Sequence, residues 1–320
     1  MSAPLVSVIL SNCGRAQFVG RALQSVLSQS YRNIEVIVVD DVPGHGAEQV
    51  VRGFNDPRVR YVRHSDRRSV AAARNHGLTL AGGQYVAFQD GDDEWLADKL
   101  AHQVARMESM PADVALTQGA VMRFHVEGAH LPYYVSGLPN EAATQDGVQL
   151  PAAAVAQAWL ARKSALDEIG KFDERLPIWE DWDLMLRLCG KWKIDIDRKA
   201  VAIVYEKPDE LFGQSDVRAA AFRLIGEKHR DLMHRYPLAM AENLYSFAKL
   251  EIIVRGQAAT GRMAAAESLR LKPRQSRVWV LLLTSLGGAL LPRLIARTVH
   301  RIRGWAWELR RRWSGEEMAA

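Results

Sequence analysis

The first hundred residues alternate between strand-like and helix-like patterns. Four short runs rich in apolar and β-branched residues predict strands, the first two of them buried. They are Leu5–Leu10, Ile34–Val39, Val59–Val62 and Tyr85–Gln89. Between them, apolar residues recur every three or four positions, which predicts helices over Phe18–Leu27, Ala47–Phe54 and Ser69–Ala81. The alternation predicts an α/β fold, a Rossmann-like and mostly parallel sheet flanked by helices.

The rest of the chain predicts a mixed middle and a helical end. Leu96, Leu100, Val104 and Met107 mark one helix, and Asp183–Leu188 indicates another. Strands are expected at Val114–Leu116, Val121–Phe124 and Ala156–Ala161. We expect one domain over residues 1–215, with halves 1–110 and 111–215, and an α-helical C-terminal region over 216–320. The Gly-, Pro- and Asn-rich loop Ser136–Leu150 is expected to form a pocket wall.

Composition favours a soluble protein of a reducing compartment. Apolar residues make up 48% of the chain and charged residues 25%, which is ordinary for a globular protein. The two cysteines, Cys13 and Cys189, have neither metal-ligand spacing nor a disulfide framework, which indicates the cytosol. The N-terminus lacks the basic start of a signal peptide. The longest apolar stretch, Val278 to Leu291, is too short and too interrupted to predict a membrane span.

The positive charge is concentrated near the C-terminus. The net charge is +5, yet residues 262–313 carry twelve Lys/Arg against two acidic residues. Between residues 293 and 313, apolar residues at three-four spacing alternate with arginines and tryptophans, as in a basic amphipathic helix at an anionic membrane surface. The alternative is a helix that packs on the first domain with a solvated basic face. No nucleic-acid motif accompanies the charge, so nucleic acid is not an expected partner. The expected location is cytoplasmic, peripheral on the inner face of the membrane.

Acidic residues follow two of the predicted strands. Asp40-Asp41 ends the second strand, and Asp90-Gly91-Asp92-Asp93 ends the fourth. Crowded carboxylates at the end of a buried strand repel one another, and a divalent cation with oxygen ligands would remove that cost. Parallel sheets also bind ligands at the carboxyl ends of their strands. The alternative is a solvated turn. Within the cluster, Asp90 and Asp92 are expected to face the metal, and Asp93 to cap a helix that begins at Glu94.

Six sequence elements in order resemble a family 2 glycosyltransferase of the GT-A fold over about residues 4–205. They are Val6-Ser7-Val8-Ile9-Leu10, Val38-Val39-Asp40-Asp41, Ala72-Ala73-Arg74-Asn75-His76-Gly77, Phe88-Gln89-Asp90-Gly91-Asp92-Asp93, Gly170-Lys171-Phe172-Asp173-Glu174 and Glu180-Asp181-Trp182-Asp183-Leu184. The resemblance implies a sugar transfer from a nucleotide-sugar donor to a glycan or lipid-linked acceptor in cell-surface polysaccharide synthesis.

The resemblance also assigns the donor side of the site. It implies that Asp92 and Asp90 hold Mn²⁺ or Mg²⁺ against the donor diphosphate, where the cation acts as a Lewis acid. Asp40 or Asp41 corresponds to the residue that binds the nucleobase. Arg74 is expected either to clamp nucleotide phosphates or to pair with the aspartate cluster.

The acceptor side is assigned to the segment around Asp181. In-line displacement at the anomeric carbon needs a carboxylate to take the acceptor proton, and this inverts the anomeric configuration. The resemblance gives that role to Asp181. Trp179, Glu180 and Trp182 are expected to line the acceptor site. Asp183 and Arg187, four residues apart, predict an ion pair within the helix.

Two departures leave other functions open. The family's aromatic-containing loop after the first strand is here Ser11-Asn12-Cys13-Gly14-Arg15, which leaves the donor nucleotide undetermined. A histidine that often completes the metal shell has only a weak candidate in His229. The Gln-x-x-Arg-Trp element of processive synthases is absent from the sequence, which favours transfer of a single sugar. The alternatives are a nucleotidyltransferase and a non-catalytic sugar-nucleotide-binding or scaffold protein.

Overall fold

The computed structural model describes most of the chain. The described residues are 3–12, 14, 16–41, 46–66, 68–125, 134–136, 143–145, 148–150, 154–206, 215–288 and 290–292. The basic segment 293–320 and most of the predicted pocket-wall loop lie outside them, as do Cys13 and Arg15 of the first loop.

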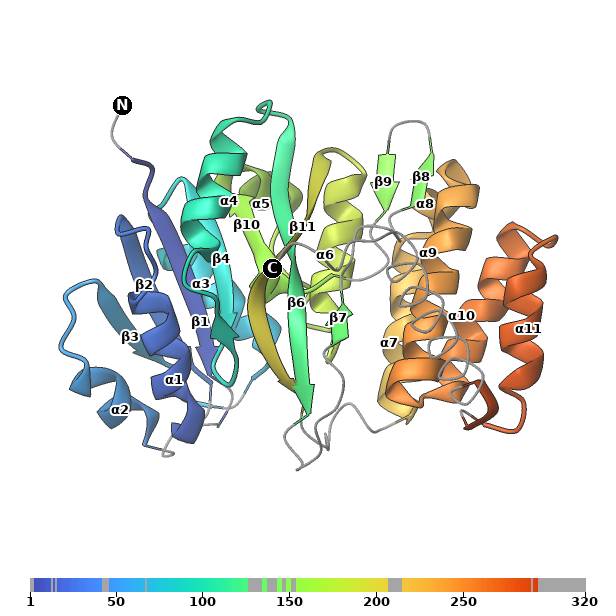
Figure 1. Cartoon of the computed structure of the whole chain (residues 1–320), viewed down its shortest axis with the longest axis horizontal. Coiled ribbons are helices and arrows are strands. Elements are labelled where there is room, and N and C mark those ends of the chain that lie inside the picture. Colours follow the sequence, from blue (N-terminus) through green and yellow to red (C-terminus); the bar gives the residue numbers. More distant parts are fainter. Residues whose placement is uncertain are drawn as a thin grey trace, which may run out of the picture.

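One large sheet runs through the α/β part of the molecule (Figure 1). Its strand order is β3-β2-β1-β4-β10-β6-β11-β5, with β7 paired to β6. The strands of the first half, β3, β2, β1 and β4, are all parallel, as are β6 and β11, whereas β10 is antiparallel to both of its neighbours. The chain leaves β1 toward β2 on one side and returns to β4 on the other. This reversal lies beside β1, where parallel sheets open a crevice for ligands.

The described residues contain eleven strands, and helices separate the first four of them. They are β1 (Val6–Asn12), β2 (Ile34–Asp40), β3 (Val59–Arg63), β4 (Tyr85–Asp90), β5 (Glu94–Trp95), β6 (Val114–His125), β7 (Tyr134–Ser136), β8 (Ala143–Gln145), β9 (Val148–Leu150), β10 (Trp159–Arg162) and β11 (Lys193–Glu206). The helices of this part are α1 (Ala16–Leu27), α2 (Ala47–Gly53), α3 (Val70–Leu80), α4 (Lys99–Glu108), α5 (Lys163–Ile169) and α6 (Glu180–Cys189), with a 3₁₀ turn at Ala156–Ala158.

The sheet separates two hydrophobic cores because side chains alternate between its faces. On β1, Val6, Val8 and Leu10 join the core under α1, α2 and α4, whereas Ile9 joins the opposite core under α3 and α6. All four side chains are fully buried. A strand covered on both faces reads as a continuous apolar run, which explains why the sequence pattern located these strands well.

Every helix and strand predicted in the first ninety residues is confirmed, within two residues at most boundaries. Three later predictions need correction. Asp93 does not cap a helix at Glu94, because Glu94–Trp95 forms β5 against β11 and α4 begins at Lys99. Val114–Leu116 and Val121–Phe124 belong to the single strand β6. Ala156–Ala161 is a 3₁₀ turn followed by β10.

The C-terminal region is helical over residues 215–288, as predicted. Its helices are α7 (Ser215–Lys228), α8 (Arg230–Arg235), α9 (Pro237–Lys249), α10 (Ala258–Leu271) and α11 (Ser276–Thr284), and a π-helical segment at Leu250–Arg255 extends α9. They stand side by side at one end of the molecule, far from β3 (Figure 1). Phe247 and Ile252 of this region share one core with Phe88 and Ile9 of the sheet. Within the described residues, no helix is long and apolar enough to cross a membrane.

Helix α3 lies unusually close to β1 at one glycine. A Cβ atom placed on Gly77 would stand 2.4 Å from Cγ2 of Ile9. Ile9 is fully buried and its β-branched side chain has no room to turn away. The small residue at position 77 therefore sets the distance between α3, which carries Arg74, and the strand ends.

We expect Gly77→Ala to lower the free energy of unfolding by about 1–3 kcal/mol, because the overpacking outweighs the better helix propensity of alanine. Gly226→Ala in α7 is the matched control, since a Cβ there meets nothing within 4 Å. It should be neutral or stabilising by about 0.5–1 kcal/mol. Denaturant unfolding of both variants measures this, and an equally stable Gly77→Ala protein would contradict the close approach.

Candidate active site

The polar ends of β1, β2 and β4 lie side by side. Asn12 pairs in register with Asp40, and Ser11 pairs with Asp90. The Nδ2 group of Asn12 donates a hydrogen bond of 2.9 Å to Oδ1 of Asp40. Gly91 sits directly against this loop, since a Cβ atom there would lie 3.0 Å from Oδ1 of Asn12. The glycine between the aspartates thus lets the acidic turn approach the end of β1.

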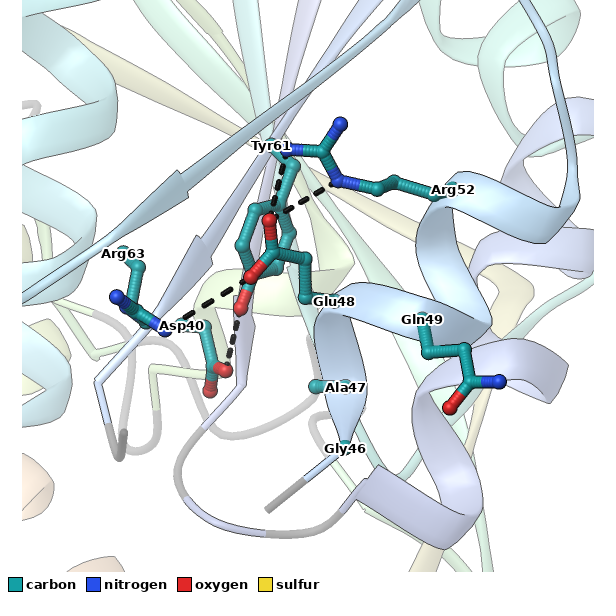
Figure 2. A pocket seen from close by; sticks show the side chains of 8 residues that line it. All are labelled: Asp40, Gly46, Ala47, Glu48, Gln49, Arg52, Tyr61 and Arg63. Atoms are coloured by element: carbon teal, nitrogen blue, oxygen red, sulfur yellow. Dashed lines mark hydrogen bonds and ion pairs between the residues drawn. The ribbon is translucent and has the colours of Figure 1, made fainter. Parts of the chain in front are cut away.

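Asp40 lines a cavity of about 450 Å³ at the end of β2 (Figure 2). The cavity lies between α2 and β3, and Tyr61 donates from its hydroxyl to Oδ2 of Asp40 at 2.7 Å. That hydrogen bond and burial raise the pKa of Tyr61, burial being the larger cause. Glu48, Arg52 and Arg63 form ion pairs along its wall. The cavity therefore offers a carboxylate acceptor and nearby cations to a polar ligand.

Asp41 has a different environment from its neighbour. Its carboxylate contacts Nδ1 of His64 at 3.0 Å and accepts from the backbone N–H of Arg68. His64 in turn contacts Nδ1 of His76 at 2.9 Å, and the two imidazole rings are stacked. Of the two candidates for the nucleobase contact, Asp40 faces the cavity and Asp41 is engaged in a buried network.

Arg74 joins the acidic turn to the start of α6. Its side chain is almost fully buried, and its two terminal nitrogens donate to Oδ1 of Asp90 at 2.7 Å and to Oε1 of Glu180 at 2.6 Å. Burial alone would lower the pKa of Arg74, but Asp90, Glu180 and Asp181 raise it above its usual value. The guanidinium therefore joins carboxylates from two sides of the site. Arg74 and Glu180 are 106 residues apart in sequence.

Asp181 lies next to this bridge, in the first turn of α6. Its carboxylate accepts a hydrogen bond from the backbone N–H of Trp182 at 2.8 Å and a longer one from that of Ala156. Burial, and then repulsion by Glu180, raise the pKa of Asp181 to about 7, against the opposing charge of Arg74. A partly buried carboxylate with a pKa near neutrality can both hold and release a proton at physiological pH.

Trp179 fixes where α6 begins. It has a left-handed backbone (φ 62°), which is strained for a residue with a large side chain, and its carbonyl accepts the first helical hydrogen bond from Asp183. Trp179 and Trp182 are only 7% and 3% exposed, and both rings pack on Phe247 of α9. Their burial holds the strained turn that presents Glu180 and Asp181.

A buried ion pair of the C-terminal region supports the same turn. Arg218 of α7 and Glu251 of the π-helical segment are both fully buried and paired. The guanidinium of Arg218 lies 4.9 Å from the ring centroid of Trp179. A cation over a buried indole face is a stabilising contact, so the C-terminal helices contribute directly to the shape of the α6 turn.

Other predicted residues have mainly supporting contacts. Asp183 forms the predicted ion pair with Arg187, and it also accepts from Lys228 and contacts Nε2 of His229 at 2.9 Å. His229, the weak candidate for a metal ligand, lies between α7 and α8 and is thus engaged with Asp183 of α6. Asn75 exchanges hydrogen bonds with the backbone of Phe172.

The acidic turn fits a hard cation that brings further oxygen ligands of its own. Burial, and then the charges of Asp92 and Asp90, raise the pKa of Asp93 to about 8. Asp93 itself is held by Gln157 and by the backbone N–H of Tyr205, which leaves Asp90 and Asp92 at the rim. The described residues contain no cluster of three or more metal-ligating side chains. Two carboxylates at the end of a strand would suit Mg²⁺ or Mn²⁺ shared with substrate phosphates.

Several residues that support the site were not predicted from the sequence. Asn12 stands at a position where we noted only the loss of an aromatic residue, and Tyr61 follows the ordinary alternation of a strand. Phe247 and Arg218 come from the helical region, which showed no chemical motif. Only the carboxylate at the end of β2 hinted that an amide from β1 would be needed beside it.

Comparison with known proteins identifies the family. The model of glycosyl transferase family 2 matches residues 7–170, just over half of the chain. The chain belongs to this family. The matched range contains Asp40, Arg74, Asp90 and Asp92 and ends before α6, so the assignment of Asp181 depends on the geometry.

Two curated relatives come from Escherichia coli. The chain is 27% identical to the putative colanic acid biosynthesis glycosyl transferase WcaA of strain K12 over 245 residues, which is 72% of this chain and 84% of WcaA. It is 33% identical over 105 residues to the UDP-Glc:alpha-D-GlcNAc-diphosphoundecaprenol beta-1,3-glucosyltransferase WfaP. That match spans 33% of this chain and less than half, 42%, of WfaP.

A solved structure shares the GT-A type fold. The mannosyltransferase PcManGT of Pyrobaculum calidifontis, solved in complex with GDP-Man and Mn²⁺, superposes with a TM-score of 0.60 at 18% identity, over 92% of this chain and 88% of that protein. At this identity the likeness establishes the fold, and the chemistry has to be argued from the residues.

Proposed function

We propose that the chain is a metal-dependent, inverting glycosyltransferase that moves a single sugar from a nucleotide-sugar donor to a glycan or lipid-linked acceptor in cell-surface polysaccharide synthesis. One observation carries the proposal. A line of polar groups runs from the cavity to α6: Asn12 contacts Asp40, its chain neighbour Ser11 contacts Asp90, and Arg74 joins Asp90 to Glu180, next to Asp181.

The donor occupies the first half of this line. The carboxylate of Asp40 accepts an N–H of the nucleobase in the cavity, while Asn12 and Tyr61 fix its orientation. The diphosphate would lie at the acidic turn, where Asp92 and Asp90 would hold the cation. When bound, the cation supplies Lewis-acid neutralisation of the departing diphosphate. Arg74 keeps Asp90 in place and adds positive charge near the phosphates.

The acceptor occupies the second half. Asp181 takes the proton of the attacking hydroxyl, so no protein nucleophile is needed and the anomeric configuration inverts. Its raised pKa suits this role, because a base is most effective when its pKa lies near the working pH. Glu180 borders the acceptor from the Arg74 side, whereas Trp179 and Trp182, packed on Phe247, shape the floor beneath it.

The names of the relatives support the choice of acceptor. WcaA is named for colanic acid biosynthesis, and WfaP for a diphosphoundecaprenol acceptor. A lipid-linked acceptor requires access to a membrane, so we place this chain on the inner face of the cytoplasmic membrane, attached through its basic C-terminus.

We keep residues 1–215 as the catalytic domain and 216–320 as the helical C-terminal region.

We expect Asp181→Asn to abolish transfer while leaving donor binding intact. Loss of a general base costs about 10²–10⁴-fold in rate, and the amide keeps the size of the side chain. Transfer and donor binding would be measured over a panel of nucleotide sugars with Mn²⁺, with Mg²⁺ and with chelator. Asp167→Asn, an exposed residue of α5, is the matched control and should behave as wild type. Wild-type turnover by Asp181→Asn would eliminate this residue as the base.

We also expect the transfer rate to depend on the ionisation of Asp181. Its pKa is raised to about 7, and only the deprotonated carboxylate accepts a proton. The value of kcat/KM should therefore be low well below pH 7, rise with pH through about 7 and reach a plateau above it. The profile would be measured from about pH 5.5 to about pH 8.5 at saturating metal. A flat profile across this range would contradict the raised pKa or the base role.

A further inference from the structure

The exposed apolar residues of this protein are concentrated at one place. Of the eight large hydrophobic residues that stand exposed among the described residues, six lie between positions 279 and 291. They are Trp279, Val280, Leu283, Leu286, Leu290 and Leu291, with exposed fractions from 47% to 75%. The other two, Val50 and Leu238, are isolated. Scattered exposed apolar residues need no explanation, but a cluster of this kind marks an interaction surface.

The cluster lies on α11 and on the residues that follow it. Trp279, Val280 and Leu283 are exposed on the helix, and Leu286, Leu290 and Leu291 are exposed beyond its last residue, Thr284. The opposite side carries Val278 and Leu281, which are buried in the core shared with the other helices. Helix α11 is the last of the row and packs on α10 (Figure 1). One side thus anchors the helix, and the other faces outward at the edge of the molecule.

Positive charges border this face along the sequence. Between Glu267 and Glu308 the chain carries eight Lys/Arg and no Asp or Glu. The segment 278–292 has no charged residue at all and is preceded by Arg270, Lys272, Arg274 and Arg277 and followed by Arg293. Arg270 pairs with Glu267, and Lys272 and Arg277 both pair with Glu242, so the four cations before the face stand against two carboxylates. An uncharged apolar face with a net positive border combines the two properties that favour an anionic lipid surface.

We propose that the apolar face of α11, defined by Trp279, Val280, Leu283, Leu286, Leu290 and Leu291, inserts into the interface of an anionic lipid bilayer. The bordering arginines and lysine then bind lipid phosphates. This inference deepens the proposed function and rests on it, since it names the element that brings the enzyme to the surface where a lipid-linked acceptor resides.

Charge complementarity disfavours the other occupants of this face. A second copy of the chain would bring the same cations against one another. The segment 293–320 would add seven further arginines with three glutamates beside the same border. Anionic headgroups neutralise the border, and their acyl chains take up the apolar side chains.

The test is co-sedimentation of the full-length chain with vesicles of equimolar phosphatidylglycerol and phosphatidylcholine, and with vesicles of phosphatidylcholine alone. The triple variant Val280→Gln, Leu283→Gln, Leu286→Gln should bind the anionic vesicles at least about tenfold more weakly than wild type. The exposed Leu238→Gln in α9 is the matched control and should bind as wild type. Binding should weaken between about 0.1 M and about 0.5 M salt, since the border contacts are electrostatic.

Hydrogen exchange on the same samples locates the contact. Vesicles should slow exchange of the amides in 276–291 of the wild-type chain. The proposal would be overturned if the triple variant and wild type bound vesicles equally, or if slowed exchange were confined to 293–320. It would also be overturned if the wild-type chain self-associated through this face without binding vesicles. Donor hydrolysis in vesicle-free solution tests the proposed function separately from membrane binding. The triple variant should hydrolyse the donor as wild type does. A wild-type chain that binds vesicles but does not hydrolyse any donor would refute only the proposed function.

Discussion

The buried guanidinium of Arg74 is the contact on which the site depends. It lies between Asp90, at the end of β4, and Glu180, at the start of α6, so it joins the two halves that must meet for transfer. A buried cation must be paired, and loss of one partner typically costs about 3–5 kcal/mol. The carboxylates next to this bridge are crowded: burial, and then repulsion by Asp92 and Asp90, raise the pKa of Asp93 to about 8, and burial, and then repulsion by Glu180, raise the pKa of Asp181 to about 7. A bound cation at Asp90 and Asp92 would relieve the same repulsion from the other side.

The C-terminal helices contribute to this arrangement although they stand at the far end of the sheet. Phe247 and Arg218 hold the strained turn at Trp179, and Glu251 neutralises Arg218 within the π-helical segment. Segments of π-helix are often found at functional sites, where they alter the direction of a side chain. The helical region therefore has two roles in the proposed function. It supports the turn that carries Asp181, and α11 presents the apolar residues that we propose for membrane contact.

The sequence predicted those parts whose causes are local. Strands buried on both faces produce nearly uninterrupted apolar runs, so β1, β2 and β4 and the acidic residues after β2 and β4 could be placed from the pattern. The role of Asp93 could not, because it depends on Gln157 and Tyr205, which are 64 and 112 residues away in sequence. The different roles of Asp40 and Asp41 also depend on residues that are distant in sequence, because Asn12, Tyr61 and His64 decide which of the two carboxylates faces the cavity. The roles of Arg218 and Phe247 could not be predicted from the sequence. A buried charge in a helix has the same local pattern as a solvated one, and an apolar residue in a helix does not reveal which turn it packs against.

The most direct test of the account is the transfer rate of Arg74→Lys. Lysine keeps the charge but not the planar, two-armed geometry that contacts Asp90 and Glu180 together. A misplaced catalytic group costs about a hundredfold, so the account predicts a protein with wild-type circular dichroism and a kcat/KM lowered by about that factor. Arg175→Lys, an exposed arginine outside the site that pairs with Asp173, should leave the rate unchanged. A folded Arg74→Lys enzyme with a transfer rate equal to that of wild type would contradict the claim that this bridge aligns the two halves of the site.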